Sequence, residues 1–127
     1  MIEAKPESKP FTPPTREEVE AMITRGPFHQ WLGLKVKSFE NDAIEIEATW
    51  RDEWRVRADA QYTHGGILAA LVDLAADWPL AHRLGRAQPT IDMRVDYHRP
   101  ATGNLIARGR IIKFGSQFSV CEAQVFD

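Results

Sequence analysis

The stretch Gly65-Gly-Ile-Leu-Ala-Ala-Leu-Val-Asp73-Leu-Ala-Ala-Asp77-Trp-Pro79-Leu-Ala-His-Arg-Leu84 decides the fold of this 127-residue chain. Its first eight residues carry no polar side chain, and Ala and Leu dominate the remainder. It is too long for an ordinary strand. A surface that is apolar nearly all round predicts a buried helix. Pro79 predicts a kink or break in the C-terminal part of that helix.

Strand-like segments lie on both sides of this helix in the sequence. Ile44, Ile46 and Ala48 alternate with polar residues, which is typical of a half-buried antiparallel strand. By the same patterning we expect strands at residues 34–39, 43–50, 91–97, 105–113 and 117–126. One buried helix with antiparallel strands before and after it indicates an α+β fold in which the sheet wraps the helix.

The N-terminal region predicts an arm followed by two short helices. Residues 1–14 hold four of the eight prolines and few apolar groups, so we expect a flexible arm. Thr15 and Glu18 form a capping-box signature for a helix over 15–24, and residues 27–33 predict a further short helix. Residues 15–127 then make a single domain, which is a size that often gains stability by oligomerising.

Composition excludes several classes of protein. The net charge is −2 with both signs interspersed, which argues against a nucleic-acid binder. One cysteine, Cys121, excludes an internal disulfide and a cysteine-rich metal site, and the histidines have no metal-like spacing. No apolar run of about 18 residues predicts a membrane span. The polar N-terminus does not resemble a signal peptide, so we expect a cytoplasmic protein.

Asp73 is the residue in the apolar helix that most requires an explanation. Burying a carboxylate without a partner costs several kcal/mol, or the group takes up a proton. One explanation is structural: Asp73 caps a backbone or pairs with an arginine such as Arg94. The other is that Asp73 is an active-site acid or base. Asp77, one turn further on, is expected to face water near the helix end.

His64, Gly65 and Gly66 open the same helix. The first N–H groups of a helix have no partner within it and, with the helix dipole, they can polarise a carbonyl or hold an oxyanion. A simple glycine turn is the alternative. Gly65 and Asp73 are eight residues apart, so they lie about 12 Å apart along a straight helix. If both act on one carbonyl, one must come from a second subunit, which suggests antiparallel helices paired across a two-fold axis.

The run from His64 to Asp73 resembles the signature of the hotdog-fold thioesterases of the phenylacetic-acid-degradation type, in the 4-hydroxybenzoyl-CoA thioesterase superfamily. That pattern is His-Gly-Gly and an apolar helix with Asp nine residues after the His. The run Thr90 to Ala101 is similar to the family's next strand and Pro-Ala turn, and Lys113-Phe114-Gly115 fits its hairpin. The resemblance covers roughly residues 27–127. It implies a long central helix wrapped by a curved antiparallel sheet, in dimers or tetramers with active sites at the dimer interface.

The resemblance also implies an activity, hydrolysis of an acyl-CoA thioester without metal or cofactor, and roles for particular residues. Asp73 would be the general base or the nucleophile, and the Gly65 N–H would polarise the thioester carbonyl. Thr90 would help to place water, and His64 would shape the oxyanion site. The expected substrate contacts are Gly66, Gln61 and Arg99.

Two other functions stay open. Many family members carry an Asn six residues before the His of His-Gly-Gly, and here that position is Ala58. This departure favours a non-catalytic acyl-CoA binding or sensing module. The third hypothesis is a hotdog hydratase acting on an enoyl-CoA, for which Asp59 and His64 would supply a loosely matched acid–base pair. There is no Gly-x-Ser-x-Gly elbow, so a serine hydrolase is unsupported.

Overall fold

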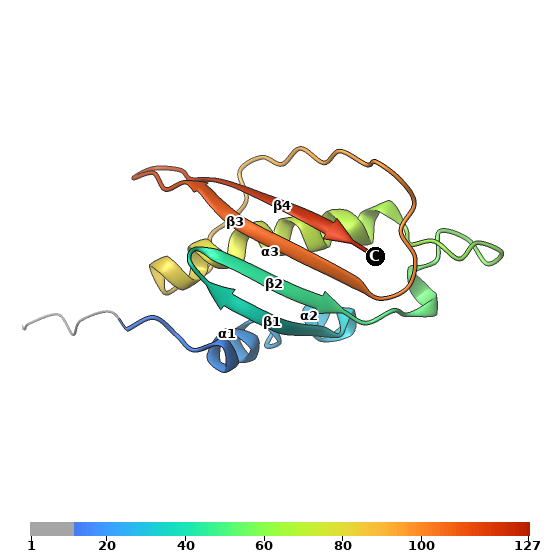
Figure 1. Cartoon of the computed structure of the whole chain (residues 1–127), viewed down its shortest axis with the longest axis horizontal. Helices are drawn as coiled ribbons and strands as arrows, with labels where there is room; N and C mark the ends of the chain where they lie inside the picture. The colour runs from blue at the N-terminus through green and yellow to red at the C-terminus, as the bar shows by residue number, and fades with distance from the viewer. Residues whose placement is uncertain (1–11) are drawn as a thin grey trace, which may run out of the picture.

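The computed structural model describes residues 12–127, and its chain forms one antiparallel sheet packed on a long helix (Figure 1). The elements in chain order are α1 (Arg16–Ile23), α2 (Pro27–Leu32), β1 (Leu34–Glu40), β2 (Ala43–Ala48), the 3₁₀ turn η1 (Asp52–Trp54), α3 (Gly65–Leu84), β3 (Leu105–Lys113) and β4 (Val120–Phe126). The strand order is β1-β2-β3-β4. The predicted α+β class is therefore confirmed. Most of the predicted arm, residues 1–11, lies outside the described residues.

Helix α1 begins as its sequence predicts. The Thr15 hydroxyl accepts a hydrogen bond from the Glu18 N–H at 3.2 Å, and the Glu18 carboxylate accepts one from the Thr15 N–H at 2.7 Å. The same helix covers the outer edge of β1. Glu20 accepts from the Val36 N–H at 2.8 Å, and Arg16 donates to the Val36 carbonyl at 2.9 Å. Side chains of α1 therefore satisfy backbone groups that the sheet leaves free at this edge.

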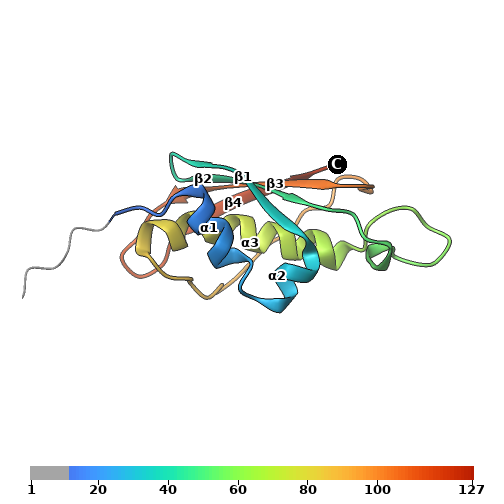
Figure 2. The ribbon, with the colours of Figure 1, turned by 90° about the horizontal axis from the view of Figure 1, so that it is seen from below.

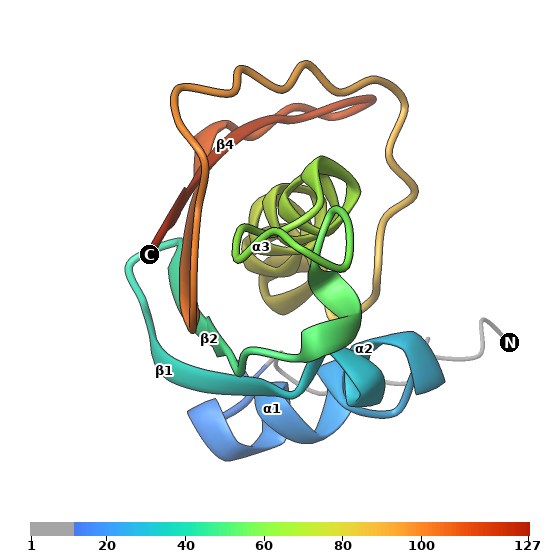
Figure 3. The same ribbon diagram turned by 90° about the vertical axis from the view of Figure 1, so that its right-hand side faces the viewer.

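Helix α3 lies along one face of the sheet, which curves around it (Figures 2 and 3). The core between them contains, among others, Val36, Ile46, Leu71, Ala75, Leu105 and Ala107. Only one face of α3 is fully buried, so the expectation of a helix buried all round holds for that face alone. The helix continues through Pro79 to Leu84, and the predicted break is wrong.

Gly109 of β3 lies against the backbone of α3 one turn before Pro79. Proline has no N–H, so the carbonyl of Ala75, four residues earlier, has no partner within the helix. That carbonyl lies against Gly109 of β3, where an added Cβ would overlap the Ala75 oxygen. The missing side chain at 109 lets the strand backbone rest directly on the helix backbone.

The predicted strand at residues 91–97 is wrong. We call residues 87–100 the strap. Within the described part of the chain, no strap residue makes a backbone–backbone hydrogen bond. The strap passes around the side of α3 away from β1 and β2 (Figure 3). A cavity lies between the strap and β4, so these two segments do not pair.

The Gly109 contact predicts a large loss of stability for Gly109→Ala. The added methyl group would overlap a backbone atom rather than a flexible side chain, so the helix and the sheet must move apart. We expect the free energy of unfolding to fall by about 2 kcal/mol or more, measured by urea denaturation. Gly26→Ala is the control, because its added Cβ would meet only His29 at 3.9 Å; it should cost about 1 kcal/mol or less. Equal losses in the two variants would contradict the assigned contact.

Candidate active site

A cavity of about 1330 Å³ lies between α3, the strap and β4. It is larger than the roughly 300–1,000 Å³ of most small-molecule pockets. Helix α3 contributes Leu68, Val72, Asp73, Ala76, Asp77, Leu80 and Leu84 to its wall. The α3 side of the cavity is therefore mainly apolar, with two carboxylates one helical turn apart on the same face.

Asp73 is held by the strap. The Thr90 hydroxyl donates a hydrogen bond to its carboxylate at 2.6 Å, and the side chain is half-buried. Arg94, the example of an arginine partner in the structural explanation, pairs instead with Asp96 at 3.2 Å. A carboxylate that accepts one hydroxyl keeps further lone pairs free. Asp73 is thus oriented and still able to take a proton.

The N-terminus of α3 presents one free N–H group. The His64 ring accepts from the Gly66 N–H at 2.8 Å, and the His64 carbonyl accepts from the Ile67 N–H at 3.0 Å. Within residues 12–127, no acceptor faces the Gly65 N–H. Gly65 is thus the donor open to a ligand, whereas the Gly66 N–H is already used by the helix cap.

Tyr97 contacts Gly65, although the sequence did not mark it as a site residue. Its hydroxyl donates to the Gly65 carbonyl at 2.8 Å. Its ring lies 3.3 Å from the position that a Cβ on Gly65 would occupy. In the sequence, Tyr97 stood out only as an apolar residue of the alternating segment 91–97. That pattern predicted a strand residue and gave no indication of a role in the site.

Asp77 lies in the cavity wall, so the expectation that it faces water near the helix end is wrong. Burial raises the pKa of its carboxyl to about 6, a backbone hydrogen bond from Gln88 opposes that rise, and the charge of Asp73 adds to it. Across the cavity, burial also raises the pKa of the Cys121 thiol, and the charge of Asp77 adds to that shift. Besides Asp73, the cavity therefore holds a carboxyl group, that of Asp77, with a pKa of about 6.

The structure brings some of the predicted site residues together and separates the rest. Asp73, Thr90 and Arg99 line the cavity. His64, Gly65, Gly66 and Gln61 lie outside its lining, at and before the N-terminus of α3. The separation follows from the length of helix between Gly65 and Asp73.

Arg99 is paired with a carboxylate of the same chain. Its guanidinium donates to both carboxylate oxygens of Asp127, which also accepts from the Thr102 N–H at 3.2 Å. A ligand phosphate would therefore have to replace Asp127 to reach this arginine.

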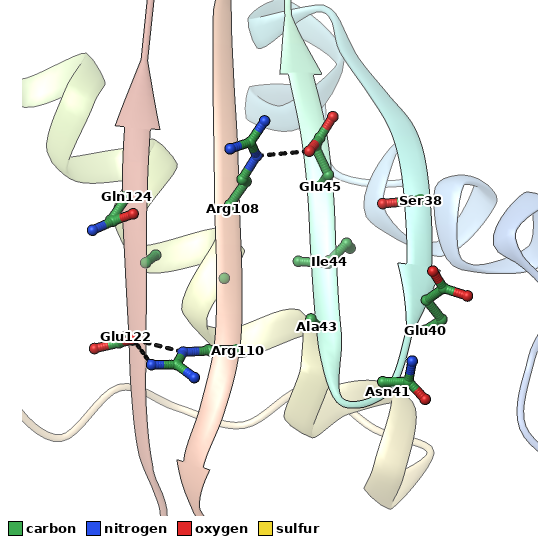
Figure 4. Close-up of a pocket in the computed structure, with 12 residues that line it drawn as sticks. Ser38, Glu40, Asn41, Ala43, Ile44, Glu45, Arg108, Arg110, Glu122 and Gln124 are labelled. Carbon is green, nitrogen blue, oxygen red and sulfur yellow. Dashed lines mark hydrogen bonds and ion pairs between the residues drawn. The ribbon is translucent and has the colours of Figure 1, made fainter.

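A second, smaller hollow of about 420 Å³ lies on the sheet and contains none of the predicted site residues (Figure 4). Its two arginines are paired, Arg108 with Glu45 at 2.7 Å and Arg110 with Glu122 at 2.6 Å. The hollow therefore presents no uncompensated positive charge to a ligand.

The part of the chain that the structure describes contains no cluster of three His, Cys, Asp or Glu side chains placed to hold a metal ion. None of its helices is both long and apolar enough to span a bilayer.

A long helix inside a curved antiparallel sheet, with a carboxylate on the helix and a free N–H at its start, is the architecture of a hotdog-fold protein. Residues 60–127 match the family model of the thioesterase superfamily. The chain therefore belongs to the thioesterase superfamily.

Individual relatives agree with this assignment. A Halobacterium salinarum protein named as an esterase is 43% identical over 102 residues, which are 75% of this chain and 66% of that protein, just under two thirds of its length. The medium/long-chain acyl-CoA thioesterase YigI of Escherichia coli is 27% identical over 124 residues, covering 84% of this chain and 79% of YigI. A crystal structure of a thioesterase-superfamily protein has a TM-score of 0.84 at 42% identity, covering 88% of this chain and 86% of that one. The E. coli PaaI protein, at 20% identity and a TM-score of 0.68 (84% and 86% covered), shares the fold.

The raised pKa of Asp77 predicts a pH-dependent stabilisation by Asp77→Asn. The folded protein holds the Asp77 proton up to a pH of about 6, whereas an unfolded aspartate releases it near 3.8, so this group lowers the stability as pH rises through that window. The variant lacks the effect. Because the group is partly exposed, we expect a gain of only about 1 kcal/mol at pH 8, which shrinks towards pH 4.5. Urea denaturation at both pH values, with exposed Asp59→Asn as control, measures it. A gain independent of pH would contradict the assignment.

Proposed function

We propose that this protein hydrolyses an acyl-CoA thioester to the free acid and CoA, with Asp73 as its central catalytic residue. The observation that carries the proposal is the Asp73 carboxylate, oriented by the Thr90 hydroxyl at 2.6 Å on the mainly apolar α3 side of the cavity. Membership of the thioesterase superfamily supports thioester hydrolysis in general. The acyl-CoA substrate is suggested by YigI, which is named as a medium/long-chain acyl-CoA thioesterase.

The chemistry needs a base and a donor to the carbonyl oxygen. As general base, Asp73 takes a proton from water while the water oxygen bonds to the thioester carbon. The Gly65 N–H donates to the developing oxyanion. The C–S bond then breaks, and the proton on Asp73 passes to the leaving thiolate of CoA. As nucleophile, Asp73 would instead attack the thioester carbon and expel the CoA thiolate, forming an acyl anhydride that water then hydrolyses to the free acid and the restored carboxylate.

Two copies of the chain are needed to complete this site. Gly65 and Asp73 are about 12 Å apart along α3, too far for one carbonyl to contact both. We therefore propose a homodimer, free or within a tetramer, in which antiparallel α3 helices bring Gly65 of the partner subunit close to Asp73. The strap supports such an interface. It carries unpaired backbone groups, and the side chains of Ile91 and Tyr97 are 83% and 57% exposed.

The remaining predicted contacts would serve the CoA part of the substrate. Gln61 is exposed in the loop before α3, close in sequence to the Gly65 donor, and Arg99 lies on the cavity wall. In this proposal Arg99 exchanges Asp127 for a CoA phosphate, which guanidinium groups bind well. Gly66 allows close approach of the thioester by having no side chain.

Thiol release from a panel of short, medium, long-chain and aryl acyl-CoA esters tests the activity. We expect turnover of at least one ester, and a fall of about 10²-fold or more for Asp73→Asn, because a catalytic base has been lost. Asp96→Asn removes a carboxylate from the strap outside the proposed chemistry and should keep wild-type activity. A wild type that binds these esters without releasing thiol would replace hydrolysis with the binding-module hypothesis, which Ala58 favours. Loss of enoyl absorbance without thiol release would identify a hydratase.

Mixing two inactive variants tests whether the site is shared. Gly65→Pro removes the N–H at the first position of α3, where proline fits a helix, and His64 already has the extended ψ of 135° that precedes proline. Gly65→Ala adds the same first side-chain atom beside Tyr97 but keeps the N–H, so the difference between the two variants isolates the loss of the donor. Refolded at equal amounts with Asp73→Asn, Gly65→Pro should restore about a quarter of wild-type turnover, because half of randomly paired dimers carry one intact site of two. No restoration would place both groups in one subunit.

A further inference from the structure

The strap is fastened to α3 at two places, each of which lies at a group of the candidate site. Thr90 donates to Asp73 at 2.6 Å, and Tyr97 donates to the Gly65 carbonyl at 2.8 Å. With no backbone ladder of its own, the strap depends on these side-chain bonds for its position.

Gly65 is held by the helix cap on one side only. The peptide that carries its N–H is fixed at the His64 carbonyl, which accepts from the Ile67 N–H at 3.0 Å. The His64 ring accepts from Gly66 rather than from Gly65. Glycine has no side chain to restrict φ and ψ, and the first residue of a helix is held less firmly than those in its interior. A backbone N–H stabilises an oxyanion only while its direction is fixed, so a contact at the Cα and carbonyl of Gly65 adds to the restraint on this donor.

Tyr97 contacts Gly65 at two points. Its hydroxyl bonds to the Gly65 carbonyl, and its ring lies where a side chain on residue 65 would begin, 3.3 Å from the Cβ position. The ring restricts the Cα atom, and the hydrogen bond restricts the carbonyl next to it. Together they limit both dihedral angles of a residue that has no side chain to limit them.

We propose that Tyr97 is a positioning residue for the oxyanion donor: its ring and hydroxyl hold Gly65 so that the free N–H keeps a constant direction. The effect of Tyr97 on catalysis depends on the proposed hydrolysis. The contact between Tyr97 and Gly65 does not depend on it. It also gives a reason for glycine at 65, since a larger residue would displace the tyrosine. Tyr97 itself donates to the peptide, and it need not touch the substrate.

The kinetic test compares Tyr97→Phe with Tyr97→Leu on the acyl-CoA ester that the wild type turns over fastest. Loss of the hydroxyl should lower kcat about 10-fold with little change in KM, because only transition-state stabilisation suffers. Loss of hydroxyl and ring should lower kcat further, so phenylalanine partly rescues the leucine variant. Tyr62→Phe, which removes a hydroxyl from the loop before α3, is the matched control and should keep wild-type kcat. Unchanged kcat in Tyr97→Phe, or an equal fall in kcat for Tyr97→Phe and Tyr62→Phe, would overturn the proposal.

The NMR order parameter of the Gly65 N–H, measured on the full chain without substrate, gives a second readout. We expect it to fall in Tyr97→Phe while the order parameters of amides in the middle of α3 keep their wild-type values. This readout separates the two proposals. A wild type without thiol release defeats the proposed hydrolysis, yet a lower order parameter at Gly65 would still establish the restraint. A wild-type order parameter at Gly65 in Tyr97→Phe would overturn the inference whatever the activity.

Discussion

The contact between Gly109 and the Ala75 carbonyl sets the orientation of everything on α3. Residues on a helix are about 100° apart around its axis, so Asp73 and Asp77, each two residues from Ala75, lie roughly on the opposite side. Once Ala75 rests on β3, both carboxylates must face away from β3. Pro79 contributes to the same contact, because it leaves the Ala75 carbonyl without a helical partner just where the strand arrives. The packing of α3 on β3 therefore also fixes the direction in which the Asp73 side chain points.

The two edge strands of the sheet have different neighbours, and the cavity lies beside the edge that no helix covers. At β1, side chains of α1 bind the backbone groups of Val36 and close the edge. At β4, the outer edge faces the cavity, and the strap that runs opposite it is fastened to α3 rather than to the sheet. The space between this sheet edge and the strap is lined by apolar residues of α3 and by polar and charged residues of the strap and β4.

The sequence predicted the parts of the fold that depend on local patterns. The capping box at Thr15, the apolar run from Gly65 and the alternation around Ile46 each specify an element through contacts within or next to that element. The strap shows the limit of this reasoning, because alternation marks a surface suited to pairing without showing that a partner strand is in reach. For the same reason Tyr97 and Asp77 were missed or misplaced: their importance comes from segments that meet only in three dimensions.

The sequence also predicted Asp73 as the central group. The length of α3 explains why Gly65 of the same chain cannot act with it on one carbonyl. A rigid helix fixes the separation of Gly65 and Asp73, and no loop movement shortens it. Within one chain, the strap spans that separation by binding Asp73 through Thr90 and Gly65 through Tyr97. A two-fold axis between antiparallel helices would create two equivalent sites, each with a base fixed by one strap and a donor fixed by the other. In such an assembly each strap orients a group in both sites, so the two sites share the parts that position their catalytic groups.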